Sequence, residues 1–282
     1  MPTAVIPDTT ILDCAGTILD LKRPVAMGIL NITSDSFYDG GNFVTQSAQL
    51  KQTEKMLSEG ASIIDIGAVS TRPGAEPVNE KTEMDRLLPT VKLLKSYFPG
   101  TIFSVDTHHS KVAKAAIDCG AGIINDIFGG RFDEKIIKVV ARANIPYILM
   151  HMQGVPGDMQ INPHYKDVLT EVKEFFSQQL VKFPKNHHQV ILDPGFGFGK
   201  SVEHNYQLLM HLDSFREFGF PVMAGMSRKS MINRVLHIQP KDALNGSTVL
   251  NTIALMKGAS ILRVHDVREA MEAIMLVETL NS

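Results

Sequence analysis

Charged and amide side chains recur where short apolar runs of this chain end. The run Val25–Leu30 gives way to Asn31, and the run 101–105 gives way to Asp106. An isolated Asp or Asn at such a place is more often a turn former or a helix cap than a ligand. Repetition around eight successive runs favours a shared site. The side chains concerned are Asn31, Asp65, Arg72, Asp106, Asn125, Asp126, His151, Asp193, Lys229, Arg263 and His265.

These side chains divide into acceptors and cations. Asp106, Asn125 and Asp193 supply acceptor oxygens, and a carboxylate can bind the N–C–N edge of a flat heterocycle through two parallel hydrogen bonds. The cationic side chains suit phosphate or pyrophosphate; they are Arg72, Lys229, Arg263 and His265. The residue types therefore indicate two ligand chemistries on one rim.

The pair Arg263 and His265 is the hardest to explain as ordinary structure. Both residues alternate with apolar neighbours on one predicted strand, so both point to the same side. A cation and an imidazole are costly to place there without an anionic partner. Hard oxygens lie near the other end of the chain, at Asn31, Asp35 and Asp39, and they suit Mg²⁺ held partly by phosphate.

An alternation of strands and helices positions these groups. Eight strand–helix units favour a closed (β/α)8 TIM barrel with its chemistry at the C-terminal ends of the strands. A doubly wound open sheet is the alternative, but no unit has a glycine-rich nucleotide-binding start. One domain is expected over 1–282, with an N-terminal hairpin extension over 1–24 and the barrel over 25–282. The predicted strands are 25–31, 62–67, 101–106, 122–125, 145–151, 189–193, 221–225 and 260–265, and the predicted helices are 45–59, 79–97, 110–119, 133–143, 165–182, 203–217, 243–257 and 267–280.

Composition is that of an ordinary globular protein. The net charge of -2 and the pI near 6.6 argue against nucleic acid or an acidic membrane surface as a partner. Two cysteines, Cys14 and Cys119, form no CxxC and suit reduced thiols in the cytoplasm. The first residues lack the pattern of a signal peptide, and no apolar run reaches the roughly 18 residues of a membrane span. We therefore expect a cytoplasmic protein.

One glycine-rich segment, Gly195–Ser201, looks like a phosphate-binding P-loop, because it follows a predicted strand and precedes a predicted helix. The P-loop spacing requires a glycine at position 194, where this chain has Pro194. The mismatch argues against an ATPase.

Eight blocks of the chain closely resemble, in order, the signatures of the dihydropteroate synthase family. The likeness extends from about residue 24 to the C-terminus and is highly specific. The blocks are Met27-Gly-Ile-Leu-Asn-Ile-Thr-Ser-Asp-Ser-Phe-Tyr-Asp-Gly-Gly41, Ile64-Asp-Ile-Gly-Ala-Val-Ser-Thr-Arg-Pro-Gly-Ala75, Ser104-Val-Asp-Thr107, Ile124-Asn-Asp-Ile127, Met150-His-Met-Gln-Gly154, Leu192-Asp-Pro-Gly-Phe-Gly-Phe-Gly-Lys200, Gly225-Met-Ser-Arg-Lys-Ser230 and Arg263-Val-His-Asp266.

The resemblance implies an enzyme of folate biosynthesis. The family condenses 6-hydroxymethyl-7,8-dihydropterin diphosphate with 4-aminobenzoate and releases diphosphate in an SN1-like reaction. By resemblance, the pterin site comprises Asp106, Asn125, Asp193 and Lys229. The diphosphate site comprises Asn31, Arg263 and His265, with Mg²⁺ at Asn31. The 4-aminobenzoate site comprises Phe37, Thr71, Arg72, Pro73 and Ser227, and Asp39 faces the developing cation.

By the same resemblance, the catalytic residues are expected to be Asn31, Asp39, Arg72, Lys229, Arg263 and His265. The family is typically a homodimer and a sulfonamide target, and the small-molecule substrates are its expected partners. Two positions depart from the family pattern, because Val69 replaces a usual Glu and Ser34 a usual Pro. Both concern the aminobenzoate loops more than the pterin pocket.

Two other functions are compatible with parts of the pattern. A methyltetrahydrofolate-dependent corrinoid methyltransferase shares the pterin-binding acceptors but does not need the Ser-Thr-Arg-Pro loop. A non-catalytic pterin-binding paralogue is favoured only by Val69, since Thr71 and Arg72 are present.

Overall fold

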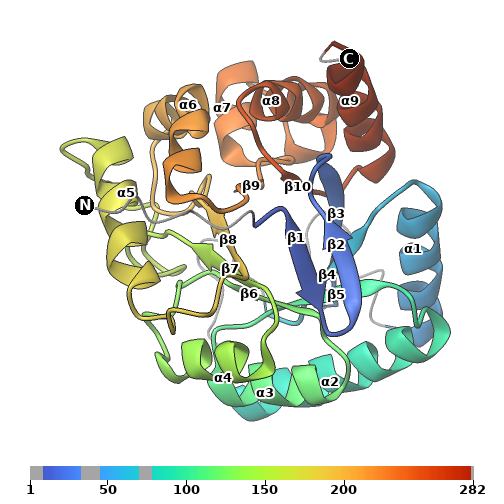
Figure 1. Cartoon of the computed structure of the whole chain (residues 1–282). Helices are drawn as coiled ribbons and strands as arrows, with labels where there is room; N and C mark the ends of the chain where they lie inside the picture. Colours follow the sequence, from blue (N-terminus) through green and yellow to red (C-terminus); the bar gives the residue numbers. More distant parts are fainter. Residues whose placement is uncertain (1–8, 33–44, 70–77, 281–282) are drawn as a thin grey trace.

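A ring of parallel strands forms the centre of the molecule, with helices around it (Figure 1). The computed structural model describes residues 9–32, 45–69 and 78–280. Within these residues, eight strands form one sheet in the order β8-β7-β6-β5-β4-β3-β10-β9. They are β3 (Val25–Asn31), β4 (Ile63–Gly67), β5 (Ile102–Asp106), β6 (Ile123–Asp126), β7 (Tyr147–Met150), β8 (Val190–Asp193), β9 (Met223–Ala224) and β10 (Ile261–Val264).

The ring is closed between its first and last members. A parallel bridge joins Leu192 of β8 to Val222, just before β9, and the Leu192 amide donates to the Pro221 carbonyl at 2.8 Å. The predicted (β/α)8 barrel is therefore confirmed.

Helices follow the strands and cover the outside of the ring. None of the described helices is long and apolar enough to cross a membrane. They are α1 (Gln46–Ser58), α2 (Glu80–Tyr97), α3 (Ser110–Asp118), α4 (Lys135–Ala143), α5 (Val168–Leu180), α6 (Val202–Met210), α7 (Ser230–Leu236), α8 (Leu244–Met256) and α9 (Val267–Leu280), with short 3-10 turns η1 (Leu212–Phe218) and η2 (Pro240–Asp242).

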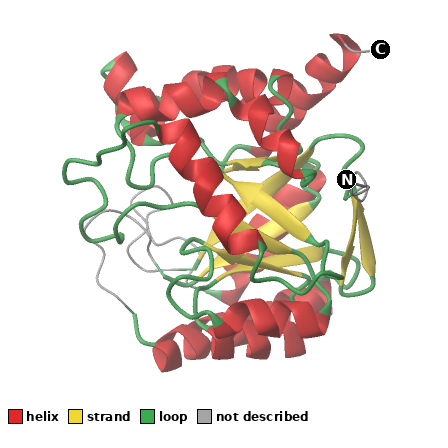
Figure 2. Cartoon of the chain, turned by 60° about the vertical axis from the view of Figure 1, so that its left-hand side comes forward, coloured by secondary structure: helices red, strands yellow, loops and turns green. Residues whose placement is uncertain are grey.

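A two-stranded hairpin closes the end of the barrel where the strands begin. β1 (Ile11–Cys14) pairs antiparallel with β2 (Thr17–Asp20), and Figure 2 shows this pair apart from the barrel strands. Each barrel strand contributes one inward apolar side chain to a buried cluster with the hairpin. The cluster contains Leu12, Cys14, Leu19, Leu21, Met27, Ile63, Ile102, Ile123, Ile148, Ile191, Met223 and Ile261. The predicted hairpin is confirmed, and it seals this end.

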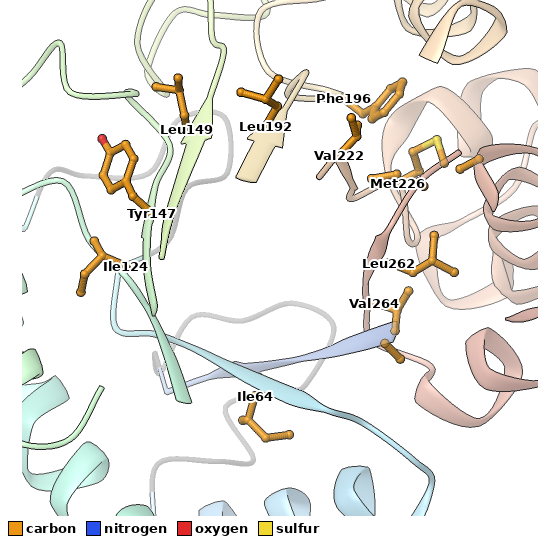
Figure 3. Packing of buried hydrophobic residues seen from close by; sticks show 14 of the residues in the cluster. Ile64, Ile124, Tyr147, Leu149, Leu192, Phe196, Val222, Met226, Leu262 and Val264 are labelled. Atoms are coloured by element: carbon orange, nitrogen blue, oxygen red, sulfur yellow. The ribbon is translucent and has the colours of Figure 1, made fainter. Parts of the chain in front are cut away.

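Residues that alternate with this inward set point toward the helices. Ile64, Ile124 and Leu262 belong to the larger buried cluster between strands and helices, and Figure 3 shows such side chains directed away from the centre of the ring. Because side chains alternate across a strand, the next inward positions beyond the sealed end lie two residues further on, and several of them, such as Asp65 and Asp193, are polar. Alternation thus places the site inside the barrel, toward the C-terminal ends of its strands.

Two helical segments differ from the sequence prediction. The predicted helix 203–217 is wrong as a single element, because α6 ends at Met210 and η1 follows. His211 breaks the helix with φ -111 and ψ 24, which lets Phe215 of η1 reach the core. Helix α7 was not predicted; it is short and ends at His237 in the left-handed conformation, so its apolar periodicity is too brief to recognise.

Candidate functional site

A row of four inward positions crosses four neighbouring strands of the barrel, and three of these positions carry polar side chains. The strand register pairs Asn31 with Gly67, Gly67 with Asp106, and Asp106 with Asn125. Paired residues on parallel strands face the same side, so these four share one inward row. A Cβ on Gly67 would lie 3.4 Å from Asn31 Oδ1 and 3.9 Å from Asp106 Oδ2. The missing side chain leaves the space between the amide and the carboxylate open.

Asp65 lies below this row and contacts both a cation and an amide of the site. Its Oδ2 accepts hydrogen bonds from Arg263 Nε at 2.7 Å and from Asn125 Nδ2 at 3.0 Å. A second carboxylate, Asp106, has Oδ2 3.6 Å from the Arg263 NH2 nitrogen. The two acids therefore hold the guanidinium in place. Asp65 also orients the Asn125 amide, whose Oδ1 has no hydrogen-bond partner among the described residues.

The charged groups inside the barrel lie close enough to shift one another's pKa values. Burial and the neighbouring Asp65 raise the pKa of Asp106, while Arg263 opposes the rise. Burial would lower the pKa of Arg263, but the attraction of Asp65 and Asp106 exceeds that effect and its pKa is raised. Arg263 is thus a permanent cation beside acids that share it, and an added anion would find it already oriented.

A lysine at the start of α7 forms the second cation of the site. Lys229 Nζ donates to the Phe196 carbonyl at 2.6 Å and lies 4.6 Å from the centre of the Phe198 ring. Burial lowers the pKa of Lys229 to about 8, although Asp193 opposes this shift. Burial likewise raises the pKa of Asp193, with Lys229 opposing. Asp193 at the end of β8 and Lys229 at the start of α7 therefore form an acceptor and a donor that are close enough to interact electrostatically.

Two loops that carry predicted ligands are clamped together. Arg228 makes a two-point ion pair with Asp266, with Nε–Oδ2 and NH2–Oδ1 distances of 2.7 Å each. Arg228 has φ +57, in the left-handed region that a non-glycine residue enters only when its surroundings hold it there. Ser227 Oγ lies 3.1 Å from Nδ1 of His265. The clamp fixes Ser227 and Lys229 beside the end of β10, where Arg263 and His265 lie.

The structure brings together most of the described residues predicted for the site. Asn31, Asp106, Asn125, Asp193, Lys229, Arg263 and His265 stand at the C-terminal ends of the barrel strands or just beyond them, and Ser227 adjoins His265. The remaining predicted residues fall in 33–44 and 70–77, outside the described residues. They are Asp35, Phe37, Asp39, Thr71, Arg72 and Pro73.

One strand-end acid faces the other way. Asp126 accepts from the Tyr147 hydroxyl at 2.6 Å and from the Phe128 and Gly130 amides at 2.8 Å. Since Asn125 points inward, Asp126 points toward the helices, where it supports the loop after β6. Its role is structural.

Sequence reasoning left two buried residues without a role. Asp65 was noted at a strand end but not assigned to the site; an acid at an inward position of an otherwise apolar strand was the available signal. Lys200 occurs in the rejected P-loop motif and at the end of one family block, without an assigned role, yet its side chain is 2% exposed and contacts His151. No sequence signal indicated that it would be buried.

An apolar wall adjoins the polar row. Met150, Met152 and Met159 form a buried cluster with Ile127 and Phe128, and Phe198 packs against it. Sulfur and aromatic groups of this kind suit the face of a flat ring. The site thus offers acceptors for the edge of a heterocycle and an apolar surface near its face.

Fold and site together define a (β/α)8-barrel enzyme built to hold a flat nitrogen heterocycle beside an anionic group. The family model described as "Pterin binding enzyme" matches residues 27–265. The chain belongs to the dihydropteroate synthase family, as the following relatives establish.

The similarity to these relatives covers nearly the whole chain. The dihydropteroate synthase of Escherichia coli (strain K12) is 44% identical over 266 residues, which cover 93% of this chain and 94% of the relative. The Yersinia pestis enzyme, solved with a sulfonamide drug complex, has a TM-score of 0.91 at 43% identity and covers 96% of this chain and 99% of its own. The Xanthomonas albilineans enzyme, solved with 4-aminobenzoic acid, has a TM-score of 0.88 at 39% identity and covers 97% and 99%.

Proposed function

We propose that this chain synthesises 7,8-dihydropteroate from 6-hydroxymethyl-7,8-dihydropterin diphosphate and 4-aminobenzoate, with release of diphosphate. One observation carries the proposal. Asp65, which accepts from both Arg263 and Asn125, lies in the same barrel as the acceptors Asp106 and Asp193. This arrangement meets both needs of the substrate, a nitrogen-rich ring and a charged leaving group.

The ring of the pterin is recognised by the acceptors. Its 2-amino and ring N–H groups donate to Asp193 and to Asn125 Oδ1, and the latter accepts from no group in the part of the chain that the structure describes. Asp106 lies next to Asn125 in the strand register and binds the opposite edge of the ring. Lys229 donates to a ring acceptor, and the methionine wall covers the face. Fixed, buried partners of this kind align the substrate before reaction.

The diphosphate departs toward the cations. The bond between the pterin methylene carbon and the diphosphate oxygen breaks, and its electron pair leaves with the diphosphate. Arg263 and His265 stabilise that developing charge, which is where preorganised donors are most effective. The arylamine nitrogen of 4-aminobenzoate then bonds to the cationic methylene and gives up a proton. The route needs no covalent nucleophile from the protein.

Asn31 is the residue suited to Mg²⁺. Its side-chain oxygen stands at the end of β3 beside the gap at Gly67, and no group of three or more His, Cys, Asp or Glu that could hold a metal occurs among residues 9–32, 45–69 and 78–280. One protein oxygen fits this ion, because Mg²⁺ in phosphate sites keeps several waters and relies on the substrate's own oxygens. Bound there, it would neutralise part of the diphosphate charge.

The aminobenzoate is proposed to sit beside Ser227 at the mouth of the barrel. Phe37, Thr71, Arg72 and Pro73 are assigned to the same site by family resemblance, and the Xanthomonas relative was solved with 4-aminobenzoic acid. A sulfonamide should therefore compete with 4-aminobenzoate and leave the KM of the pterin diphosphate unchanged. Competition with the pterin diphosphate would instead mean that this pocket is misassigned.

The decisive assay is dihydropteroate formation from the two purified substrates with Mg²⁺. We expect turnover that depends on both substrates, and a large fall in it for Asp193→Ala. Intact pterin binding without any product would contradict the proposal and favour a non-catalytic pterin-binding protein.

We also propose a homodimer that buries one face of α8 and α9. These helices pack against each other, and they expose Ile253, Met256, Leu276 and Leu280. An apolar patch of this kind is typical of an association surface. Leu276→Asp should convert the dimer to a monomer in sedimentation velocity, whereas the matched change Val181→Asp, at an exposed position after α5, should not.

The cytoplasm is the proposed location. Cys14 and Cys119 are both free, as expected of a reducing compartment. Cell fractionation would test this assignment.

A further inference from the structure

Lys200 is a buried lysine that the proposed reaction does not use. Its Nζ donates to the Gly195 and Phe198 carbonyls, each at 3.0 Å, and lies 3.0 Å from Nδ1 of His151. The His151 carbonyl is 3.4 Å away. Burying an ammonium is costly unless its protons are hydrogen-bonded. Here the protons connect two segments, the loop after β8 and the end of β7.

The loop 194–200, called the glycine loop below, is pressed tightly onto the segment after β7. Gly195 and Gly199 have φ of +71 and +61, and a Cβ on either would meet a backbone oxygen of that segment, His151 O at 1.9 Å or Gln153 O at 2.2 Å. Only glycine allows both the conformation and the approach. The glycines explain how close the loop can lie, and Lys200 supplies the bonds that hold it there.

The other side of the glycine loop faces the pterin site. Its Phe196 carbonyl accepts from Lys229 Nζ at 2.6 Å, and its Phe198 ring lies 4.6 Å from the same nitrogen. A Cβ on Gly197 would come within 3.1 Å of Lys229 Cδ. The first amide beyond Pro194, that of Gly195, donates to Asp193 Oδ1 at 2.8 Å. One loop therefore contacts both the donor Lys229 and the acceptor Asp193.

We propose that Lys200 is a positioning residue for the pterin site. By joining the Gly195 and Phe198 carbonyls to His151, it fixes the glycine loop so that the loop aims Lys229 and Asp193 at the pterin ring. The likeness of the glycine loop to a P-loop is therefore misleading, since Lys200 Nζ is bonded to carbonyls of its own loop and to His151. The inference rests on the proposed function, because it concerns the pterin of that reaction.

Charge supports this role. Burial lowers the pKa of Lys200 to about 7, and Asp193 opposes the shift. Lys200 in turn is one of the cations that oppose the burial-driven rise in the pKa of Asp193. The cation thus stabilises the ionised form of the acceptor as well as the shape of the loop.

The test compares Lys200→Met with Val172→Ala, a cavity-forming change at a fully buried position of α5. The KM for pterin diphosphate and the calorimetric Kd for a pterin lacking diphosphate should rise at least about tenfold in Lys200→Met, the effect of losing one charge-assisted hydrogen bond. The KM for 4-aminobenzoate should stay unchanged. Val172→Ala should lower the melting temperature without changing either pterin constant.

A second variant protects the test against a Lys200→Met protein that does not fold. His151→Leu keeps the lysine and its two loop carbonyls but removes one partner, so it should raise the pterin Kd in the same direction by less. Unchanged pterin affinity in the folded variants, or an equal rise in both KM values, overturns the inference. Failure of the wild-type chain to form dihydropteroate would instead count against the proposed function, since pterin affinity is measured separately.

Discussion

Replacing Asp65 with Asn removes the charge shared by two halves of the site while preserving the size of the side chain. Asp65 is fully buried and accepts from Arg263 and Asn125. Breaking a buried ion pair by removing one partner costs about 3–5 kcal/mol. Because Asp106 remains 3.6 Å from the guanidinium, we expect the lower end of that range, about 3 kcal/mol.

Two measurements follow from that loss. At roughly 2 °C per kcal/mol for a large domain, the melting temperature should fall by about 6 °C. The kcat/KM for pterin diphosphate should fall about 100-fold, which corresponds to about 2.7 kcal/mol, because Arg263 and Asn125 both lose their orientation. Binding of 4-aminobenzoate should change little, since Asp65 lies deep in the barrel.

Asp126→Asn is the matched control. Asp126 is equally buried and lies on β6, but its side chain points to the outer side of the sheet, where it accepts from the Tyr147 hydroxyl. It should lose stability with little change in kcat/KM for pterin diphosphate. If Asp65→Asn behaves like this control, or keeps wild-type kinetics, then Asp65 does not organise the site and the reasoning is refuted.

Three further predictions concern the same barrel. Arg228→Lys should raise the KM for pterin diphosphate several-fold because an ammonium cannot make the two-point pair with Asp266, and the exchanged pair Arg228→Asp with Asp266→Arg should recover part of the loss in steady-state assays. Lys229 is cationic below its pKa of about 8 and neutral above it, so kcat/KM for pterin diphosphate should decline as pH rises through that value; a pH–rate profile without this decline would contradict the assignment. Gly67→Val should fill the gap beside Asn31 and weaken binding of the pterin diphosphate, measured by calorimetry, at little cost in melting temperature.

Much of the fold was predictable because the barrel repeats one simple pattern. Several strands are short apolar runs that end in a polar residue, so strands such as Val25–Asn31 were placed without error. The same reasoning failed at 203–217, since one hydrophobic period runs through α6 and η1 while the backbone turns at His211. Local periodicity does not contain the packing that decides where a helix stops.

Site residues were predictable where the residue type alone indicates a role. They were less predictable where the role depends on which side of the sheet the side chain faces or on whether it is buried. Arg263 on an alternating strand could only face a polar interior, and it does. Asn125 and Asp126 are adjacent and look equivalent in sequence, yet the pleat sends them to opposite sides. The burial of Lys200 was not predicted, because it is held by backbone carbonyls, which no side-chain pattern encodes.

The hairpin of β1 and β2 closes one end of the barrel, so the barrel has a single opening. Four hairpin side chains, Leu12, Cys14, Leu19 and Leu21, pack against a ring contributed by every barrel strand, so nothing passes through that end. Substrates and products must then share the opposite opening. Asp106 and Asn125, to which the pterin is assigned above, lie inside the barrel. On that assignment, we expect the pterin to bind before the arylamine. The closed end of the barrel would therefore set the order in which the two substrates bind.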